Sequence, residues 1–437
     1  MWTRLVLDHL TLGTNAFDLS VFDYALWSTL EGPRAGFVPF LGQSLYSHHF
    51  MPTLSLLMPL YSLVPPPLLL ISVEVASFAA AAFCIASMAG RRLPILAAFA
   101  LTAAFLLGRR AYGMSSSVFY IECLEPLFIF GLVWSVSTQR LGYYWLFLVL
   151  VLGCNENVAL YMAAYGFVLM LQRSTRQLGA ATMAFSLLWA VVAVEVFIPA
   201  ARALDGLPLD YAFVAERYGD APVIESLERL FRFISVQRVV GVLLMTGLIG
   251  LLGPKWLLVL APGVLLNLAA RDEAVQSGLI RHYLWPIAPF LFLAAIEGAA
   301  LLAQRHPRLL RAWAVVLIIG IAADSPVLKP QHFLEAVRLY DRSAAIRADL
   351  EAIPMELDVL AQPQLVPHIP KRVSMRAIGM QQLRQPVTAQ VVVLSRLGEQ
   401  WPLTQADFDG IVSRLDADHH YARAETAADL IMFVRTR

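Results

Sequence analysis

Ionisable side chains are scattered through an otherwise apolar chain, and these are the residues that could do chemistry. Carboxylates can serve as general bases, and arginine and histidine can donate hydrogen bonds to an oxyanion. An ionisable group at membrane depth is costly unless it is paired or hydrated, so each one is a candidate functional residue. In chain order the candidates are Asp18, Asp23, His48, His49, Glu122, Glu125, Glu156, Arg281 and His282.

The two N-terminal aspartates lie in an aromatic stretch. On a helix, residues five apart differ in direction by about 140°, so Asp18 and Asp23 are not expected to share a face or to act as a pair. The structural alternative for either residue is a helix N-cap, a common place for aspartate. For His48-His49 the alternatives are an ordinary interfacial pair or contact with a metal or phosphate.

Three glutamates interrupt apolar stretches. Glu122 and Glu125 are three residues apart and would share one face of a helix. Glu156 lies between Asn155 and Asn157, and such a polar break is tolerated at membrane depth only against protein or a wet cavity. A functional role is favoured for Glu122 and Glu156, and an Asn-stabilised turn is the alternative for Glu156.

The composition indicates which elements must position these residues. Of the 437 residues, 58% are hydrophobic and 15% are charged, and the mean hydropathy is +0.64. A soluble domain carries about 25% charged residues, so lipid is expected to be much of this chain's solvent. The 33 basic and 32 acidic residues give a net charge of +1, which argues against nucleic-acid binding.

The apolar runs predict an α-helical polytopic membrane protein with about ten membrane helices, because roughly 20 apolar residues cross a bilayer. The clearest runs are residues 67–89, 93–107, 118–136, 178–200, 239–252, 256–270, 283–303 and 312–323. Residues 142–171 are expected to form two shorter helices that meet at the polar break. After residue 323 the charges become frequent and short apolar segments alternate, which predicts a small α/β domain. The expected division is therefore an N-terminal external loop (1–50), a membrane domain (51–323) and an external soluble α/β domain (324–437).

Basic residues in short loops set the expected orientation, since such loops favour the cytoplasm. They occupy alternate connections, at Arg91, Arg92, Arg140, Arg173, Arg176, Lys255, Arg305, Arg308 and Arg311. This topology makes the N-terminal segment, residues 109–117, 201–237 and 271–282, and the C-terminal domain external. Only Arg109-Arg110 opposes it. The chain is expected to be a multi-pass protein of the cell membrane.

Several short motifs occur in the same order as in a known family. The segment FDLSVFDYALW (17–27) resembles the FDLGIFDQALW opening of the DUF2079 family of polytopic membrane proteins. HFMP (49–52) is similar to that family's HFSP, ECL (122–124) to HPEAL, and NEN (155–157) stands where KED is usual. RHY (281–283) resembles the HY helix entry, and LVPH (365–368) resembles a segment of the external domain. The resemblance therefore covers nearly the whole chain.

The family is grouped with the GT-C glycosyltransferases, which use polyprenyl-phosphate-linked sugars on the external face. The resemblance implies that a carboxylate of the first external loop is the general base or a metal ligand, a role that falls to Asp18 or Asp23. The departures are Tyr120 in place of a histidine, and Asn155 and Asn157 in place of Lys and Asp, which argue against phosphate binding beside Glu156.

The mechanism expected from these residues is an inverting transfer. Asp18 is the first-choice base, with Asp23 as its orienting residue or as a metal ligand. Arg281 and His282 would hold the leaving phosphate.

The remaining candidates have supporting roles in that mechanism. His49, next to His48, is the second candidate for the phosphate, and Glu122 and Glu156 would bind sugar hydroxyls or position the cations. Mg²⁺ or Mn²⁺ would suit the carboxylates but is not required.

The expected partners are a polyprenyl-phosphate sugar donor, the bilayer, and a glycan, lipid or protein acceptor, without nucleic acid. Two other functions fit the same residues. The first is a transporter or flippase of a lipid-linked substrate, in which intramembrane carboxylates relay protons. The second is a non-catalytic binder of lipid-linked glycans.

Overall fold

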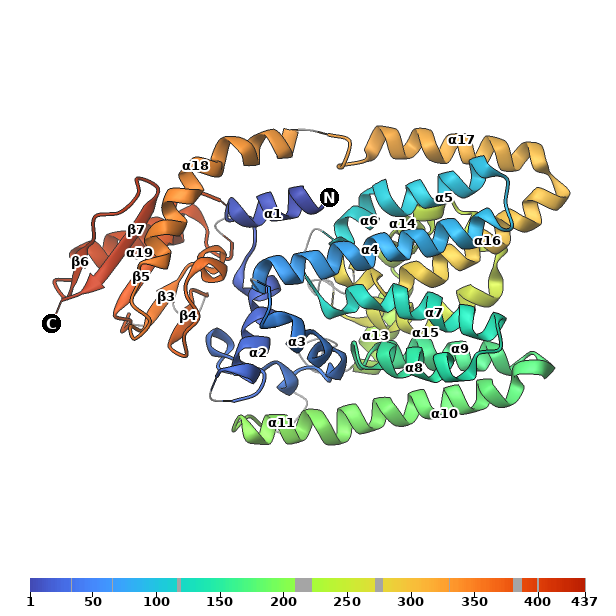
Figure 1. Cartoon of the computed structure of the whole chain (residues 1–437), viewed down its shortest axis with the longest axis horizontal. Helices are drawn as coiled ribbons and strands as arrows, with labels where there is room; N and C mark the ends of the chain where they lie inside the picture. Colours follow the sequence, from blue (N-terminus) through green and yellow to red (C-terminus); the bar gives the residue numbers. More distant parts are fainter. Residues whose placement is uncertain are drawn as a thin grey trace. The chain divides into compact units, whose positions relative to one another are not determined.

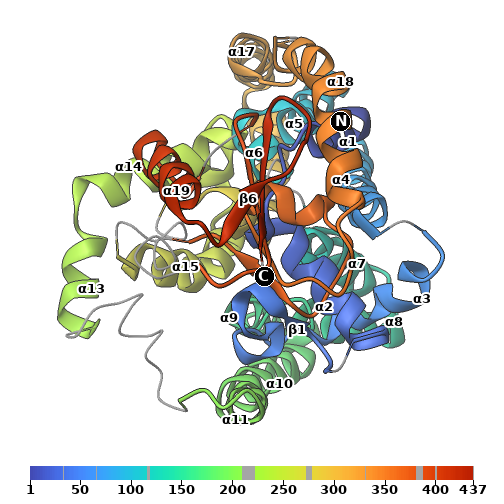
Figure 2. The same cartoon turned by 90° about the vertical axis from the view of Figure 1, so that its left-hand side faces the viewer.

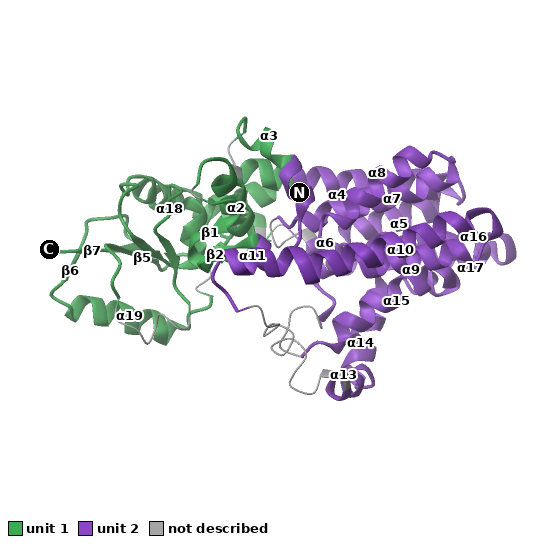
Figure 3. Ribbon diagram, turned by 90° about the horizontal axis from the view of Figure 1, so that it is seen from below, with its two compact units in different colours: residues 1–45, 57–72, 330–437 green, residues 46–56, 73–329 purple. Residues whose placement is uncertain are grey.

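The chain forms two compact units in a computed structural model that describes residues 1–32, 34–64, 66–115, 119–208, 222–271, 278–329, 331–379, 387–398 and 401–436. Unit 1 comprises Met1–Leu45, Leu57–Ser72 and Pro330–Arg437, and unit 2 comprises Tyr46–Leu56 and Val73–Lys329 (Figure 3). This grouping differs from the expected division by chain order, because the N-terminal 45 residues cluster with the C-terminal segment. Parts of the expected external loops, residues 116–117, 209–221 and 272–277, lie outside the described residues.

Unit 2 is helical throughout the part that the structure describes. Its helices in the first half are α4 (Pro66–Gly90, which begins in unit 1), α5 (Ile95–Leu107), α6 (Arg109–Ser115), η5 (Ile121–Leu124), α7 (Glu125–Ser137), α8 (Leu141–Leu152) and α9 (Val158–Met170). The second half contains η6 (Arg173–Thr175), α10 (Arg176–Val192), η7 (Ala193–Phe197), α11 (Ile198–Leu204), α13 (Pro222–Leu230), α14 (Phe233–Leu243), η8 (Leu244–Thr246), η9 (Ile249–Leu252), α15 (Pro254–Ala269), η11 (Arg281–Leu284), α16 (Ile287–Arg305) and α17 (Pro307–Asp324).

Among the described residues, four helical stretches are long and apolar enough to cross a membrane: Pro67–Gly90, Ile95–Met114, Arg173–Leu204 and Arg281–Arg305. Shorter apolar helices cover Leu141–Leu152, Val158–Met170, Phe233–Thr246 and Pro254–Ala269. The prediction of two short helices around a polar break is confirmed, since α8 ends at Leu152 and α9 begins at Val158.

Helices α9 and α10 pack side by side, as do α7 with α8 and α5 with α17 (Figure 1). Gly166 and Gly179 bring the first pair into backbone contact, because a Cβ at Gly166 would lie 2.6 Å from the backbone nitrogen of Met183. Small residues permit such close approach between membrane helices, where packing rather than water drives association. The stretch that contains α16 is the most buried of the four described stretches long enough to cross a membrane, and Phe290 and Phe292 of this helix are fully buried.

Unit 1 contains a five-stranded mixed sheet in the order β4-β3-β5-β7-β6. The strands are β3 (Val359–Ala361), β4 (Met375–Ala377), β5 (Val391–Ser395), β6 (Tyr421–Arg423) and β7 (Leu430–Arg435). Strand β3 is parallel to β4 and β5, with Val359 opposite Val391, whereas β7 is antiparallel to β5 and β6. Every residue of β5 is buried, as expected for a central strand.

Helices cover this sheet, with α18 (Gln331–Glu351) and α19 (Gln405–Ala417) on opposite sides of it (Figures 2 and 3). Phe408 of α19 packs with Val392 and Phe433 in the core. The expected small C-terminal α/β domain is thus a mixed sheet with two covering helices.

The N-terminal segment of unit 1 packs against the C-terminal one. It comprises α1 (Trp2–Leu10), the π-helix η1 (Ala16–Ser20), α2 (Val21–Leu30), β1 (Phe37–Val38), η2 (Pro39–Leu41), β2 (Gln43–Ser44) and α3 (Met58–Tyr61). The short helices η3 (Leu45–Ser47) and η4 (Pro52–Leu57) lie mostly in unit 2. Helix α1 packs on α18, and η1 packs on η12 (Pro363–His368). These contacts explain why the two ends of the chain belong to one unit.

Candidate functional site

Unit 2 contains a polar cluster built from three segments that are far apart in the chain. His49 and Glu156 form an ion pair, with 2.9 Å between Nδ1 and Oε1. The second oxygen of Glu156 accepts a hydrogen bond of 3.0 Å from the backbone nitrogen of Phe50. Asn155 donates through Nδ2 to Oε1 of Glu122 at 2.8 Å. Asn155 therefore links three of the predicted site residues, because it binds Glu122 and directly precedes Glu156, which binds His49.

The irregular backbone between α8 and α9 holds this cluster in place. The Thr53 hydroxyl donates to the Leu150 carbonyl at 2.8 Å, and the Thr53 backbone nitrogen donates to the Gly153 carbonyl at 2.9 Å. Gly153 permits this approach, because a Cβ there would collide with the Thr53 side chain. Asn155 Oδ1 accepts from the Asn157 backbone nitrogen at 3.0 Å, so the Asn-stabilised turn exists and presents Asn155 to Glu122.

Two neighbouring carboxylates are buried at the start of α7. Glu122 is 6% exposed and Glu125 is 1% exposed. One oxygen of each, Oε2, has no hydrogen-bond partner among the described residues. A buried carboxylate oxygen without a partner is costly, and such groups concentrate where a ligand or proton is handled.

The remaining candidates of unit 2 flank this region. His282 in η11 stacks on Tyr120, with 3.9 Å between ring centroids and 14° between planes. Tyr120 directly precedes the η5 turn that carries Glu122, so this contact joins His282 to the segment of Glu122. Arg281 is exposed and has a positive φ of 55°, and His48 is exposed beside His49.

Asp23 lies in unit 1 as half of a buried ion pair. It is 1% exposed, and Nζ of Lys371 lies 2.5 Å from its Oδ2. Its Oδ1 accepts a hydrogen bond of 2.6 Å from the Tyr61 hydroxyl. Burial raises the pKa of Tyr61, and the nearby Asp23 carboxylate raises it further, so the phenol stays protonated as a donor. Both carboxylate oxygens of Asp23 are thus occupied.

Asp18 lies in the π-helix η1 and is half-buried. The N-cap of η1 is Asn15, whose Oδ1 accepts from the Phe17 backbone nitrogen at 2.9 Å. Ser20 occupies the N-cap position of α2. The N-cap alternative for Asp18 and Asp23 is therefore wrong, because other residues occupy both cap positions.

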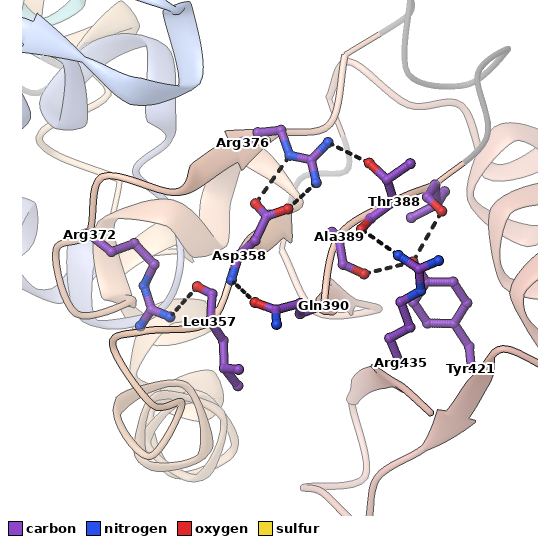
Figure 4. A network of polar contacts seen from close by, with 10 residues as sticks. Leu357, Asp358, Arg372, Arg376, Thr388, Ala389, Gln390, Tyr421 and Arg435 are labelled. Atoms are coloured by element: carbon purple, nitrogen blue, oxygen red, sulfur yellow. Dashed lines mark hydrogen bonds and ion pairs between the residues drawn. The ribbon is translucent and has the colours of Figure 1, made fainter. Parts of the chain in front are cut away.

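Lys371 is held by the segment around it. Its neighbour Arg372 is 3% exposed and donates to the Pro354 carbonyl at 2.8 Å. It also donates to the Leu357 carbonyl at 3.3 Å (Figure 4). The Lys371 ammonium also lies 5.4 Å from the ring centroid of Tyr24. These contacts fix Lys371 against Asp23.

An open cleft of about 540 Å³ in unit 1 begins at this ion pair. It is lined by Trp27, Glu31, Tyr61, Ser62, Leu63, Val64, Met355 and Lys371. Aromatic faces, a carboxylate, a hydroxyl and an ammonium group together suit a polyhydroxylated ligand, which needs both stacking and hydrogen bonds.

A metal ion at Asp18 and Asp23 does not fit the described residues. The Lys371 ammonium occupies the Asp23 carboxylate, and no group of three or more His, Cys, Asp or Glu side chains among the described residues could hold a metal. No chemical step is therefore assigned to Mg²⁺ or Mn²⁺.

Sequence reasoning missed the partners of the residues that it singled out. Lys371, Tyr61 and Asn155 each bind a predicted carboxylate. Lys371 lies 348 residues from Asp23, and no local pattern pairs residues at such a separation. Asn155 could have been recognised from the sequence, because it is a polar residue next to Glu156 in an otherwise apolar stretch.

Comparison with known proteins places the chain in a family. A family model described as "Predicted membrane protein (DUF2079)" matches residues 8–432. Searches of curated proteins and of solved structures returned no significant match.

Proposed function

Because the chain belongs to the DUF2079 family of predicted membrane proteins, we propose that it is a membrane glycosyltransferase of the GT-C kind. It transfers a sugar from a polyprenyl-phosphate-linked donor to an acceptor on the external face of the cell membrane. The observation that supports this function is the partly buried polar cluster of His49, Glu122, Asn155 and Glu156 among apolar helices. A lipid-linked sugar requires polar groups among apolar helices, and this cluster supplies them.

The proposed reaction is a displacement at the anomeric carbon. The acceptor oxygen forms a bond to this carbon while the bond from the carbon to the phosphate oxygen breaks. The electron pair of that bond leaves with the polyprenyl phosphate, and a general base takes the proton of the acceptor hydroxyl. Asp18 is the proposed base, because the family resemblance gives this role to Asp18 or Asp23, and Asp23 is engaged by Tyr61 and Lys371.

The other residues have roles that follow from their contacts. Asp23 is a positioning residue for Lys371. Arg281 and His282 bind the leaving phosphate. Glu156 orients His49, because both of its oxygens are engaged by the His49 segment.

Glu122 completes this set of roles. It offers its Oε2 to a sugar hydroxyl, since that oxygen has no partner among the described residues.

The test measures polyprenyl phosphate released from a radiolabelled polyprenyl-phosphate hexose or pentose by membranes that contain the full chain. Polyprenyl phosphate is released whichever acceptor receives the sugar, so the assay does not require the acceptor to be known. The membranes supply the acceptors. Asp18→Asn is expected to lower the release about a hundredfold or more while the protein still accumulates and folds, as for loss of a general base. Asp341→Asn, on the exposed face of α18, is the matched control and should retain the activity. Unchanged release by Asp18→Asn would remove Asp18 from the mechanism.

A second candidate function is proton-coupled transport of a lipid-linked substrate. It is favoured by the two buried oxygens of Glu122 and Glu125 that have no partner among the described residues. In that case Glu125→Gln abolishes transbilayer movement of the labelled lipid, and no donor is cleaved. Binding of the donor without either movement or cleavage would identify a non-catalytic glycan binder.

A further inference from the structure

A groove of about 510 Å³ opens on the helical unit. Its walls come from the α5–α6 stretch, from α14 with η8, and from α17. Small and apolar residues dominate the lining, among them Ala104, Leu244, Met245, Trp313, Leu317 and Gly320. The lining residues of the α5–α6 stretch, from Ala104 to Ala111, lie within the membrane-crossing range Ile95–Met114, so the groove is expected to face hydrocarbon.

The groove has a buried floor and an exposed apolar rim. Ala104 and Leu317 are buried, whereas Val316 is 68% exposed and Leu244 is 53% exposed. Trp313 forms part of the lining, and its indole nitrogen is fixed by a hydrogen bond of 3.1 Å to the Gly247 carbonyl. An apolar groove with such a rim suits a hydrocarbon chain that enters from the bilayer.

Polar groups gather in one part of the lining. Arg109 forms an ion pair with Asp324 at 2.8 Å, and Arg110 donates through its NH1 nitrogen to the Leu279 carbonyl at 2.9 Å. Two arginines and one aspartate leave one net positive charge. Ser325 also lines the groove, is 1% exposed, and its hydroxyl has no hydrogen-bond partner among the described residues.

We propose that this groove binds an anionic phospholipid of the bilayer. One acyl chain lies over Trp313 and Leu317, and the phosphate accepts hydrogen bonds from Arg110 and Ser325. Basic pockets between membrane helices bind anionic headgroups, and guanidinium groups suit phosphate oxygens. The apolar lining favours a lipid over free phosphate.

This assignment accounts for Arg109-Arg110, the one basic pair that opposes the expected orientation. It does not rest on the proposed transferase, because none of the residues that line the groove belongs to the proposed reaction. The charged lining residues are the two arginines and Asp324, and Asp324 is already paired with Arg109, which points to binding rather than to chemistry.

Native mass spectrometry of the full chain in detergent, with dioleoylphosphatidylglycerol or dioleoylphosphatidylcholine added, tests the proposal. The wild-type chain is expected to prefer the anionic lipid about fivefold, the effect of about one basic group near a headgroup. Arg110→Gln should abolish this preference, whereas Arg92→Gln, in an exposed turn that does not line the groove, should keep it.

A second variant blocks the hydrocarbon part of the groove. A Cβ at Gly320 meets open space, so Gly320→Leu can fill the groove without a clash and should weaken lipid binding at least about tenfold. Gly142→Leu in α8 also meets open space, does not line the groove, and is the matched control. Unchanged binding by Gly320→Leu would overturn the proposal.

A third measurement needs no variant. Dihexanoylphosphatidylglycerol has the same headgroup with short chains and should bind at least about tenfold more weakly than the dioleoyl lipid, since it buries fewer methylene groups in the groove. Displacement of the bound lipid by inorganic phosphate alone, or a preference for polyprenyl phosphate over phosphatidylglycerol, would also contradict the assignment.

Discussion

At the scale of single residues, the carboxylates of this chain differ in their interaction partners. Asp23 is neutralised by Lys371, and Glu156 is paired with His49. Glu125 is as deeply buried as Asp23, but its Oε2 has no partner among the described residues. A paired carboxylate can position a neighbour, whereas a carboxyl oxygen without a partner is available to a substrate or a proton. Burial alone therefore does not assign a role to these residues.

The Asp23–Lys371 pair gives a stability prediction. Lys371→Met should lower the free energy of unfolding by about 3 to 5 kcal/mol, because it leaves the Asp23 carboxylate buried without its counter-ion. Denaturant unfolding of the full chain in micelles, followed by tryptophan fluorescence, measures this change.

Two control variants distinguish the loss of the Lys371 charge from the loss of its side-chain packing. The double variant Lys371→Met with Asp23→Asn should recover most of the lost stability, since no unpaired charge remains. Exposed Lys329→Met should stay within about 0.5 kcal/mol of the wild type. A double variant as unstable as Lys371→Met would mean that packing, not charge, explains the loss.

At the scale of elements, α1 and η12 join the two ends of unit 1 through a histidine pair. His9 of α1 stacks on His368 of η12 with 4.5 Å between ring centroids, and its Nδ1 lies 2.9 Å from the Thr14 hydroxyl. Burial, with smaller effects from Arg347 and Lys371, lowers the pKa of His9 to about 4. Burial also lowers the pKa of His368, well below its usual range. Both rings are therefore neutral when the contact is formed.

This contact should make the stability of unit 1 depend on pH. In the unfolded chain the histidines take up protons below about pH 6.5, while the folded His9 does so only near pH 4. The unfolded state thus binds more protons in this window. The free energy of unfolding therefore falls by up to about 1.4 kcal/mol per pH unit for each histidine as the pH is lowered. Thermal unfolding between pH 7 and pH 5 measures the loss.

The variant that tests the cause is His9→Phe combined with His368→Phe, which keeps two stacked rings without titratable groups. It should flatten the pH dependence between pH 7 and pH 5. A decline as steep as that of the wild type would assign the effect to other groups.

At the scale of the whole molecule, the chain is a multi-pass membrane protein with a C-terminal mixed sheet. Its two units are not successive pieces of the chain, since unit 1 collects residues from both ends and from Leu57–Ser72. The orientation proposed from the basic loops puts the sheet outside the cell.

A membrane-impermeant maleimide tests this orientation. Gln405→Cys on α19 should react in intact cells, whereas Arg91→Cys in the turn after α4 should react only after permeabilisation; both positions are exposed. The native cysteines Cys123 and Cys154 are buried and Cys84 is half-buried, so the unsubstituted chain provides the background. Labelling of Arg91→Cys but not of Gln405→Cys in intact cells would reverse the topology.

The sequence alone determined the features that depend on local composition. Apolar runs predicted membrane helices, the polar Asn155–Asn157 stretch predicted the break between α8 and α9, and the change after residue 323 predicted a small α/β domain. Only the tertiary structure decided which charges are paired. Lys371 meets Asp23 across 348 residues, and His49 meets Glu156 across 107. The physical reason is that hydropathy acts on each segment separately, whereas an ion pair forms only where folding brings two distant side chains to the same place.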